Sequence, residues 1–242
     1  MNQTANTCRA SLIFTALILM TAANADDNCR HRMDIFEEVQ LDGISEIVVD
    51  AGAGKLIVVG EPGVTQVQID GVACATDEDD LKQISVKSTR DGETLVLRTE
   101  IPRPAKSWMG SKYARLDLEL NVPDNLPIRV TDTSGSLKVS DVAAVAIEDG
   151  SGSIQVQDVS GDVEIISDGS GSISVVRSGS VHITEDGSGS ITAAQIENDV
   201  YVGRDGSGSI SAKDVGGNFI VKSDGSGSVS HRRVAGAVKI SD

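Results

Sequence analysis

The C-terminal half of the chain alternates aliphatic and polar residues in short runs that Gly-rich segments separate. One such unit reads Ile154-x-Val156-x-Asp158-Val159-x-Gly161-x-Val163-x-Ile165. A period of two is typical of strands that bury one face. Each unit is therefore predicted to contain two short strands, joined by a corner that in this unit spans residues 158–161.

A hexad that begins with aspartate marks the other corner of each unit. It reads Asp-Thr-Ser-Gly-Ser-Leu at first and then Asp-Gly-Ser-Gly-Ser-Ile or -Val, beginning at Asp132, Asp149, Asp168, Asp186, Asp205 and Asp224. Glycine permits a positive φ and aspartate accepts backbone N–H groups in an Asx turn, so the hexad suits a corner. A flexible Gly/Ser linker would not recur in register between aliphatic positions.

Units of this kind bring the chain back to its starting direction and stack on one another. The sequence therefore predicts an all-β fold, a single-stranded right-handed parallel β-helix (β-solenoid), with six regular turns over residues 131–242. Two interior columns are expected, one with Leu137, Ile154, Ile173, Ile191, Ile210 and Val229, the other with Val145, Val163, Val181, Val200, Phe219 and Val238. His231 follows Ala193 and Ala212 at another interior position, and we interpret it as a charge at a terminal edge.

Residues 26–130 are also strand-like, but their repeat is blurred. Strands are expected at 44–49, 55–59, 67–72, 84–89, 94–98 and 116–122. An acidic stretch at residues 77–80 and a loop at 102–112 interrupt the pattern. We expect an irregular N-terminal β region that continues and caps the solenoid, since terminal repeats need caps. A separate small sandwich is the alternative.

The first 25 residues have the pattern of a secretory signal peptide. Arg9 precedes an apolar run at residues 12–20, and Ala23-Asn24-Ala25 lies before two acidic residues. The run is too short for a stable membrane-spanning helix, so cleavage after Ala25 and export are expected, without membrane insertion. Cleavage removes Cys8 and leaves Cys29 and Cys74, which predicts one disulfide; two separate buried thiols are the alternative.

The formal net charge of −15 argues against a nucleic-acid partner, because phosphates would meet a repulsive field. Aromatic residues make up only 2% of the chain, which fits a sheet with a core of small aliphatic side chains.

The sequence also carries a family resemblance. Its basis is the run Leu116-x-Leu118-x-Leu120-x-Val122-Pro123, followed by Ile128-x-Val130, by Ser134-Gly135-Ser136-Leu137 and by the serial Ser-Gly-aliphatic repeats. Residues 40–242 resemble the bacterial putative-adhesin β-strand-repeat family of unknown function, which is similar to the head domain of putative autotransporter adhesins. The resemblance implies a right-handed β-helix at the cell envelope.

The hexad aspartates would stack as a column without interleaved cations. Like charges at strand spacing repel, so hydrogen bonds from Gly and Ser N–H groups are expected to compensate. Calcium between turns, held by Asp149, Asp168, Asp186, Asp205 and Asp224, is the alternative, although the hexad matches neither the EF-hand loop nor the Gly-Gly-x-Gly-x-Asp repeat. The opposite corner column has both acids and cations, which can pair across turns: Asp141, Asp158, Arg177, Gln195, Asp214 and Arg233.

Two places are candidates for partner binding. His182 and Tyr201 lie side by side in an outward column, where they suit a shallow sugar or peptide site. The locally basic loop contains Trp108, the only tryptophan, and leads to Tyr113. Long loops often carry function and tryptophan is a favoured anchor.

No catalytic motif or cofactor fingerprint is present, and His31, His182 and His231 are isolated in the sequence. We therefore expect an exported, non-enzymatic, adhesin-like structural or binding module that contacts an envelope or extracellular protein or glycan surface. The alternatives are a polysaccharide-binding or -cleaving β-helix protein and a calcium-stabilised scaffold. The location is the periplasm, the cell surface or the medium.

Overall fold

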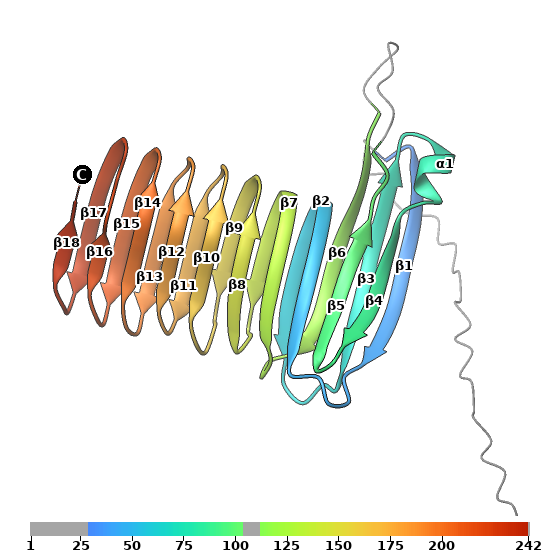
Figure 1. The fold of residues 1–242 in the computed structure, drawn as a ribbon, viewed down its shortest axis with the longest axis horizontal. Coiled ribbons are helices and arrows are strands. Elements are labelled where there is room, and N and C mark those ends of the chain that lie inside the picture. Colours follow the sequence, from blue (N-terminus) through green and yellow to red (C-terminus); the bar gives the residue numbers. More distant parts are fainter. Residues whose placement is uncertain (1–28, 104–111, 242) are drawn as a thin grey trace, which may run out of the picture.

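The structure is a computed structural model that describes residues 29–103 and 112–241. Its strands stack side by side into a rod (Figure 1). Eighteen strands of the described residues belong to one continuous sheet, which closes around an apolar interior.

The regular part of the rod has two walls of parallel strands. The first wall contains β8 (Ala144–Asp149), β10 (Val163–Asp168), β12 (Val181–Asp186), β14 (Val200–Asp205), β16 (Phe219–Val221) and β18 (Val238–Ile240). The second wall contains β9 (Gly152–Gln157), β11 (Ile173–Ser178), β13 (Ile191–Ile196), β15 (Gly208–Val215) and β17 (Gly227–Val234). Each strand pairs in parallel with the strand one turn further along its wall, as β10 does with β12 and β11 with β13. The predicted all-β parallel solenoid is confirmed.

The aliphatic columns form the interior of this stack. Ile173 pairs with Ile191 on the second wall, and Val163 pairs with Val181 on the first. Members of the two predicted columns are at most 3% exposed, except in the last turn. His231 pairs with Ala212 and is exposed there. Burial of such side chains stabilises the fold by about 1.5–3 kcal/mol each, so the columns hold the turns together.

Two long strands extend the stack into the N-terminal half. β2 (Glu46–Glu61) and β7 (Pro127–Ser140) each run through both walls and pair in parallel from Ile47 with Ile128 to Val59 with Ser140. Residues 51–56 of β2, with the sequence Ala-Gly-Ala-Gly-Lys-Leu, occupy the place of the hexad. The hexad pattern is obscured in this turn because alanine stands where the repeat has aspartate.

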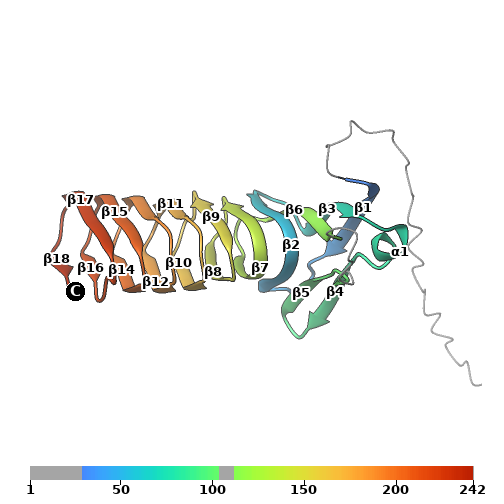
Figure 2. The same cartoon turned by 90° about the horizontal axis from the view of Figure 1, so that it is seen from above.

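Beyond β2 the two walls diverge (Figure 2). The second wall continues through β6 (Ala114–Pro123), which is parallel to β2, and then through the antiparallel strands β3 (Gln66–Ala75) and β1 (His31–Gln40). The first wall continues through β5 (Thr94–Glu100), which forms an antiparallel hairpin with β4 (Ser85–Asp91). Antiparallel strands thus end a stack whose body is parallel.

Strand β1 has no counterpart among the strands expected from the sequence. Its half-buried positions include Met33, Ile35 and Val39, but Glu37 shares that face and interrupts the hydrophobic alternation. Burial raises the pKa of Glu37. The acidic stretch forms a short helix, α1 (Glu78–Leu81), beside β1 and β3.

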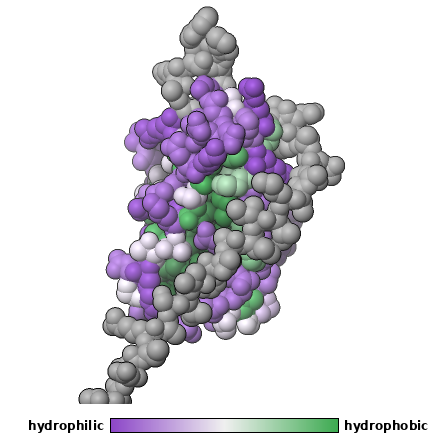
Figure 3. Space-filling model, turned by 90° about the vertical axis from the view of Figure 1, so that its right-hand side faces the viewer, coloured by the Kyte–Doolittle hydropathy of each residue, from purple (hydrophilic) through white to green (hydrophobic). Residues whose placement is uncertain are grey.

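The end of the rod formed by these strands is partly apolar. Figure 3 looks onto this end and shows apolar side chains in its middle, bordered by hydrophilic ones. β1 contributes Met33, Ile35 and Val39, which pack against the core but are only half-buried.

Candidate functional site

A disulfide links β3 to the residues just before β1. Cys29 and Cys74 are bonded, with 5.4 Å between their Cα atoms, so the predicted disulfide is confirmed. The phenol oxygen of Tyr113 accepts a hydrogen bond from the backbone N–H of Arg30 at 3.2 Å. Tyr113 therefore helps to hold the same end of the rod, whereas Trp108 lies outside the described residues.

The aspartates of the hexads form a buried column at the corner that leads from the first wall to the second. Consecutive members pair from Asp132 to Asp224 across all turns. The side chains of Asp132, Asp149, Asp168, Asp186 and Asp205 are 1–4% exposed, so they point into the fold. We call these five residues and Asp224 the aspartate column.

Backbone hydrogen bonds satisfy part of this column. The Ser151 N–H donates to Asp149 Oδ1 at 3.3 Å and the Ser170 N–H to Asp168 Oδ1 at 3.2 Å, which are the expected Asx turns. Both side-chain oxygens of Asp132, Asp186 and Asp205, however, are buried without such a donor. The expected compensation by Ser and Gly N–H groups is therefore incomplete.

The column resists ionisation. Burial, assisted by repulsion from Asp149, raises the pKa of Asp132 and of Asp168 to about 6. Burial and repulsion from Asp168 and Asp205 raise the pKa of Asp186 to about 7. Burial also raises the pKa of Asp149 and Asp205. Loss of hydration disfavours the charged form in each case.

The opposite corner, from the second wall back to the first, uses residues other than glycine in the left-handed region. Its members have φ between 55° and 60°: Asp141, Asp158, Arg177, Gln195, Asp214 and Arg233. The Arg177 guanidinium donates to both carboxylate oxygens of Asp158, at 2.5 and 2.7 Å, and Arg233 contacts Asp214 in the same manner. These arginines lower the pKa of Asp158 and Asp214. The predicted pairing across turns is present.

The outward column of the first wall brings His182 and Tyr201 together. They are paired positions of β12 and β14, and their rings stack with centroids 4.5 Å apart and 23° between the planes. Glu164 precedes them and Ile220 follows. The arrangement is a small aromatic surface on an otherwise regular wall.

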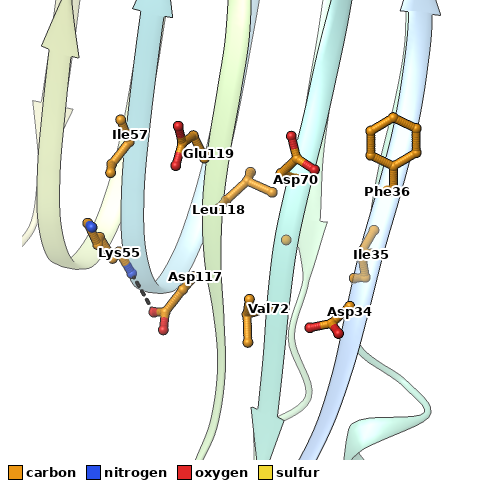
Figure 4. Close-up of a pocket in the computed structure, with 11 residues that line it drawn as sticks. Asp34, Ile35, Phe36, Lys55, Ile57, Asp70, Val72, Asp117, Leu118 and Glu119 are labelled. Atoms are coloured by element: carbon orange, nitrogen blue, oxygen red, sulfur yellow. Dashed lines mark hydrogen bonds between the residues drawn. The ribbon is translucent and has the colours of Figure 1, made fainter. Parts of the chain in front are cut away.

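A groove crosses the outer face of β1, β3, β6 and β2 (Figure 4). The pairing register places Phe36, Asp70, Glu119 and Ile57 in one row across these strands. A second row contains Asp34, Val72 and Asp117, and Lys55 lies beside it. Gly71 lies between the rows, and the hollow has a volume of about 330 Å³.

The groove combines apolar side chains with unbalanced negative charge. Phe36 is 59% exposed, which is unusual for a large apolar side chain. Arg32 contacts Asp34 at 2.9 Å and Arg115 contacts Asp117 at 3.5 Å, so these carboxylates are neutralised in part. Asp70 accepts only the amide of Gln68, and among the described residues no hydrogen bond or ion pair holds Glu119.

This groove could not be predicted from the local sequence because its lining comes from four strands that are far apart along the chain. Phe36 at an exposed position between acidic residues was the only local signal. No three His, Cys, Asp or Glu residues of the described chain are grouped to hold a metal ion. Within the same residues, no helix is long and apolar enough to span a membrane.

No known protein-family model matches the sequence, and no curated protein sequence matches it. The chain is similar to the solved structure of a putative cell adhesion protein from Clostridium sporogenes, with 12% identity, a TM-score of 0.37 and coverage of 87% of this chain and 99% of that one. It is similar to a putative adhesin from Bacteroides fragilis, with 14% identity, a TM-score of 0.32 and coverage of 88% and 99%.

A third solved structure is a putative lipid binding protein from Parabacteroides distasonis, with 14% identity, a TM-score of 0.32 and coverage of 86% and 97%. Putative adhesins, the class that the repeat resembles, are thus among the solved structures similar to this chain.

Proposed function

We propose that the protein is an exported, non-enzymatic binding module of the bacterial cell envelope, which contacts an envelope or extracellular partner through the groove over β1, β3, β6 and β2. The observation that carries this proposal is the groove itself, where the exposed Phe36 lies in one row with Asp70 and Glu119. An exposed aromatic side chain beside unbalanced carboxylates fits a partner surface with a cationic group next to an apolar one.

The Cys29–Cys74 disulfide supports export, because disulfides persist mainly in oxidising compartments. The regular walls support a scaffold rather than an enzyme, since a catalytic site needs nucleophile, base and stabilising groups brought together in one pocket. The groove holds carboxylates and Lys55 but neither histidine, serine nor cysteine.

The proposal is tested by fractionation of cells that produce the full chain and by binding of the purified protein to intact cells and isolated envelopes. We expect the protein in an exported fraction and a loss of binding of about tenfold or more for Phe36→Ser combined with Glu119→Gln. Ile240→Ser, which removes another exposed large apolar side chain, is the matched control at the far end of the rod. Retention in the cytoplasm, or equal binding by both variants, contradicts the proposal.

A carbohydrate-active protein is the second candidate, favoured by the stacked rings of His182 and Tyr201 on the outer wall. Aromatic faces offer apolar contact area next to polar groups, which suits a sugar ring. A glycan array with the His182→Ala and Tyr201→Ala variants tests binding, and a parallel turnover assay tests cleavage. Binding that persists in both variants rejects this surface as the sugar site.

A further inference from the structure

The aspartate column contains neighbouring buried carboxyl groups, several of whose oxygens have no hydrogen-bond donor. Asp186 and Asp205 lie on paired positions of β12 and β14, so their side chains are neighbours one turn apart along the rod. Each is only 1% exposed, and both side-chain oxygens of each are buried without a hydrogen-bond partner. Two ionised carboxylates are both acceptors and cannot hydrogen-bond to each other. A proton or a cation between the two carboxyl groups would relieve this conflict.

Among the described residues no cation compensates the column, and the backbone N–H groups of Ser188 and Ser207 lower the pKa of Asp186 and Asp205 only in part. The charges that raise the pKa of a column member belong to other members: Asp149 acts on Asp132 and Asp168, Asp168 and Asp205 act on Asp186, and Asp224 acts on Asp205. Charged neighbours on the same strands are exposed instead, namely Glu148, Glu185 and Arg204. Across the interior, the second wall presents aliphatic side chains such as Ile154, Ile173 and Ile191.

We propose that the aspartate column binds protons within the fold, so that a carboxylic acid of one turn donates an O–H hydrogen bond to a carboxylate oxygen of the next. The proton comes from solvent and returns to it when the column ionises, and no covalent bond other than O–H forms or breaks. A proton satisfies two buried acceptors at once and removes one of two adjacent charges. The column then holds bound protons between successive turns along the rod.

The column couples proton binding to the stability of the turns. In the fold Asp132 and Asp168 have a pKa of about 6 and Asp186 a pKa of about 7, against an ordinary value of 3.8. Between these values the folded chain binds more protons than the unfolded chain. The contribution to stability is therefore complete below about pH 4 and is lost as the pH rises through about 6 to 7. At higher pH, like charges repel at the strand spacing of about 4.8 Å.

Stability of the purified protein from pH 5 to pH 8 tests this inference, with EDTA or with millimolar CaCl₂. We expect the unfolding temperature to fall over this range, and to fall less in Asp186→Asn, whose amide donates without a proton from solvent. Glu185→Gln, the exposed neighbour, is the matched control and should retain the full fall. A flat profile in the wild type, or an unchanged fall in Asp186→Asn, overturns the proposal.

Two further measurements distinguish protons from a bound cation: the effect of calcium on the unfolding temperature, and carboxyl carbon NMR. Calcium that restores the unfolding temperature at pH 8, but has no effect at pH 5, assigns the column to a cation instead of protons and overturns the proposal. Carboxyl carbon NMR of the wild type needs no variant to fold. It should show column aspartates with midpoints near pH 6 to 7, and midpoints that are all below about pH 5 would reject proton binding. None of these outcomes depends on the proposed envelope function.

Discussion

The imidazole ring of His182 stacks on the phenol ring of Tyr201 one turn further along the rod, with 4.5 Å between the ring centroids. Parallel stacking in a solenoid places equivalent positions of successive turns next to each other, so one aromatic residue per turn suffices to form a ladder. His182 belongs to β12 and Tyr201 to β14, and the stack therefore links two turns of the first wall.

We expect this ring pair to stabilise the fold by about 0.5–1.5 kcal/mol beyond the two separate side chains. A double-mutant cycle with His182→Ala and Tyr201→Ala, followed by urea unfolding, measures the coupling. A cycle between Glu164 and Tyr201 is the control, because these residues are two turns apart. A coupling no larger than in the control would show that the stack contributes nothing.

The glycine at the fourth hexad position is predicted to be irreplaceable. Gly171 has φ of 140°, and a Cβ there would lie 1.4 Å from the carbonyl oxygen of Gly152 in the preceding turn. Gly171→Ala should cost at least about 3 kcal/mol in the free energy of unfolding. Gly92→Ala, at φ of 60° with no atom within 4 Å, should cost only about 1 kcal/mol. Equal costs would argue that φ alone, and not the close contact between turns, requires glycine.

The opposite corner offers a stabilising substitution. Gln195 has φ of 57°, a left-handed conformation that costs an L residue about 1–2 kcal/mol. Gln195→Gly should therefore raise the free energy of unfolding by about 0.5–1 kcal/mol after the loss of chain entropy. Gln155→Gly, in the middle of β9, should lower it by about 1 kcal/mol. Thermal and urea unfolding compare the two, and a loss at Gln195 disagrees with this account.

The disulfide should contribute strongly to the N-terminal strands. It closes a loop with a sequence separation of 45, which stabilises a fold by about 4 kcal/mol in the chain-entropy model. We expect dithiothreitol to lower the unfolding temperature of the wild type and to leave the Cys29→Ser, Cys74→Ser double variant unchanged. Equal unfolding of the reduced and oxidised wild type would contradict this expectation.

Much of the regular stack could be predicted from local sequence. Ile154 and Ile173 recur at equivalent positions, so the same pattern gives both the strand and its partner in the next turn. The N-terminal half was harder to predict because β2 pairs with β7 although their sequences differ and about 80 residues separate them. The additional turn has one local signal, the Gly-x-Gly spacing that follows Ala51, the residue opposite Asp132.

Of the candidate sites, those formed by equivalent positions of the repeat could be predicted from the sequence, and the others could not. The cation pairing of Arg177 with Asp158 followed from the column order, because equivalent positions of successive turns are neighbours. The groove around Phe36 could not be predicted in this way, because β1 and β2 are not adjacent and β3 and β6 lie between them in the sheet.

That the hexad aspartates form one column follows from the repeat alone, because units stacked in register leave no other arrangement. Only the folded chain shows that its buried members point into the fold, where water is excluded: Asp132, Asp149, Asp168, Asp186 and Asp205. The direction of a corner side chain depends on how the chain bends between the two walls, which alternation along one strand does not specify. The inward direction turns a row of surface charges into buried carboxyl groups with raised pKa values.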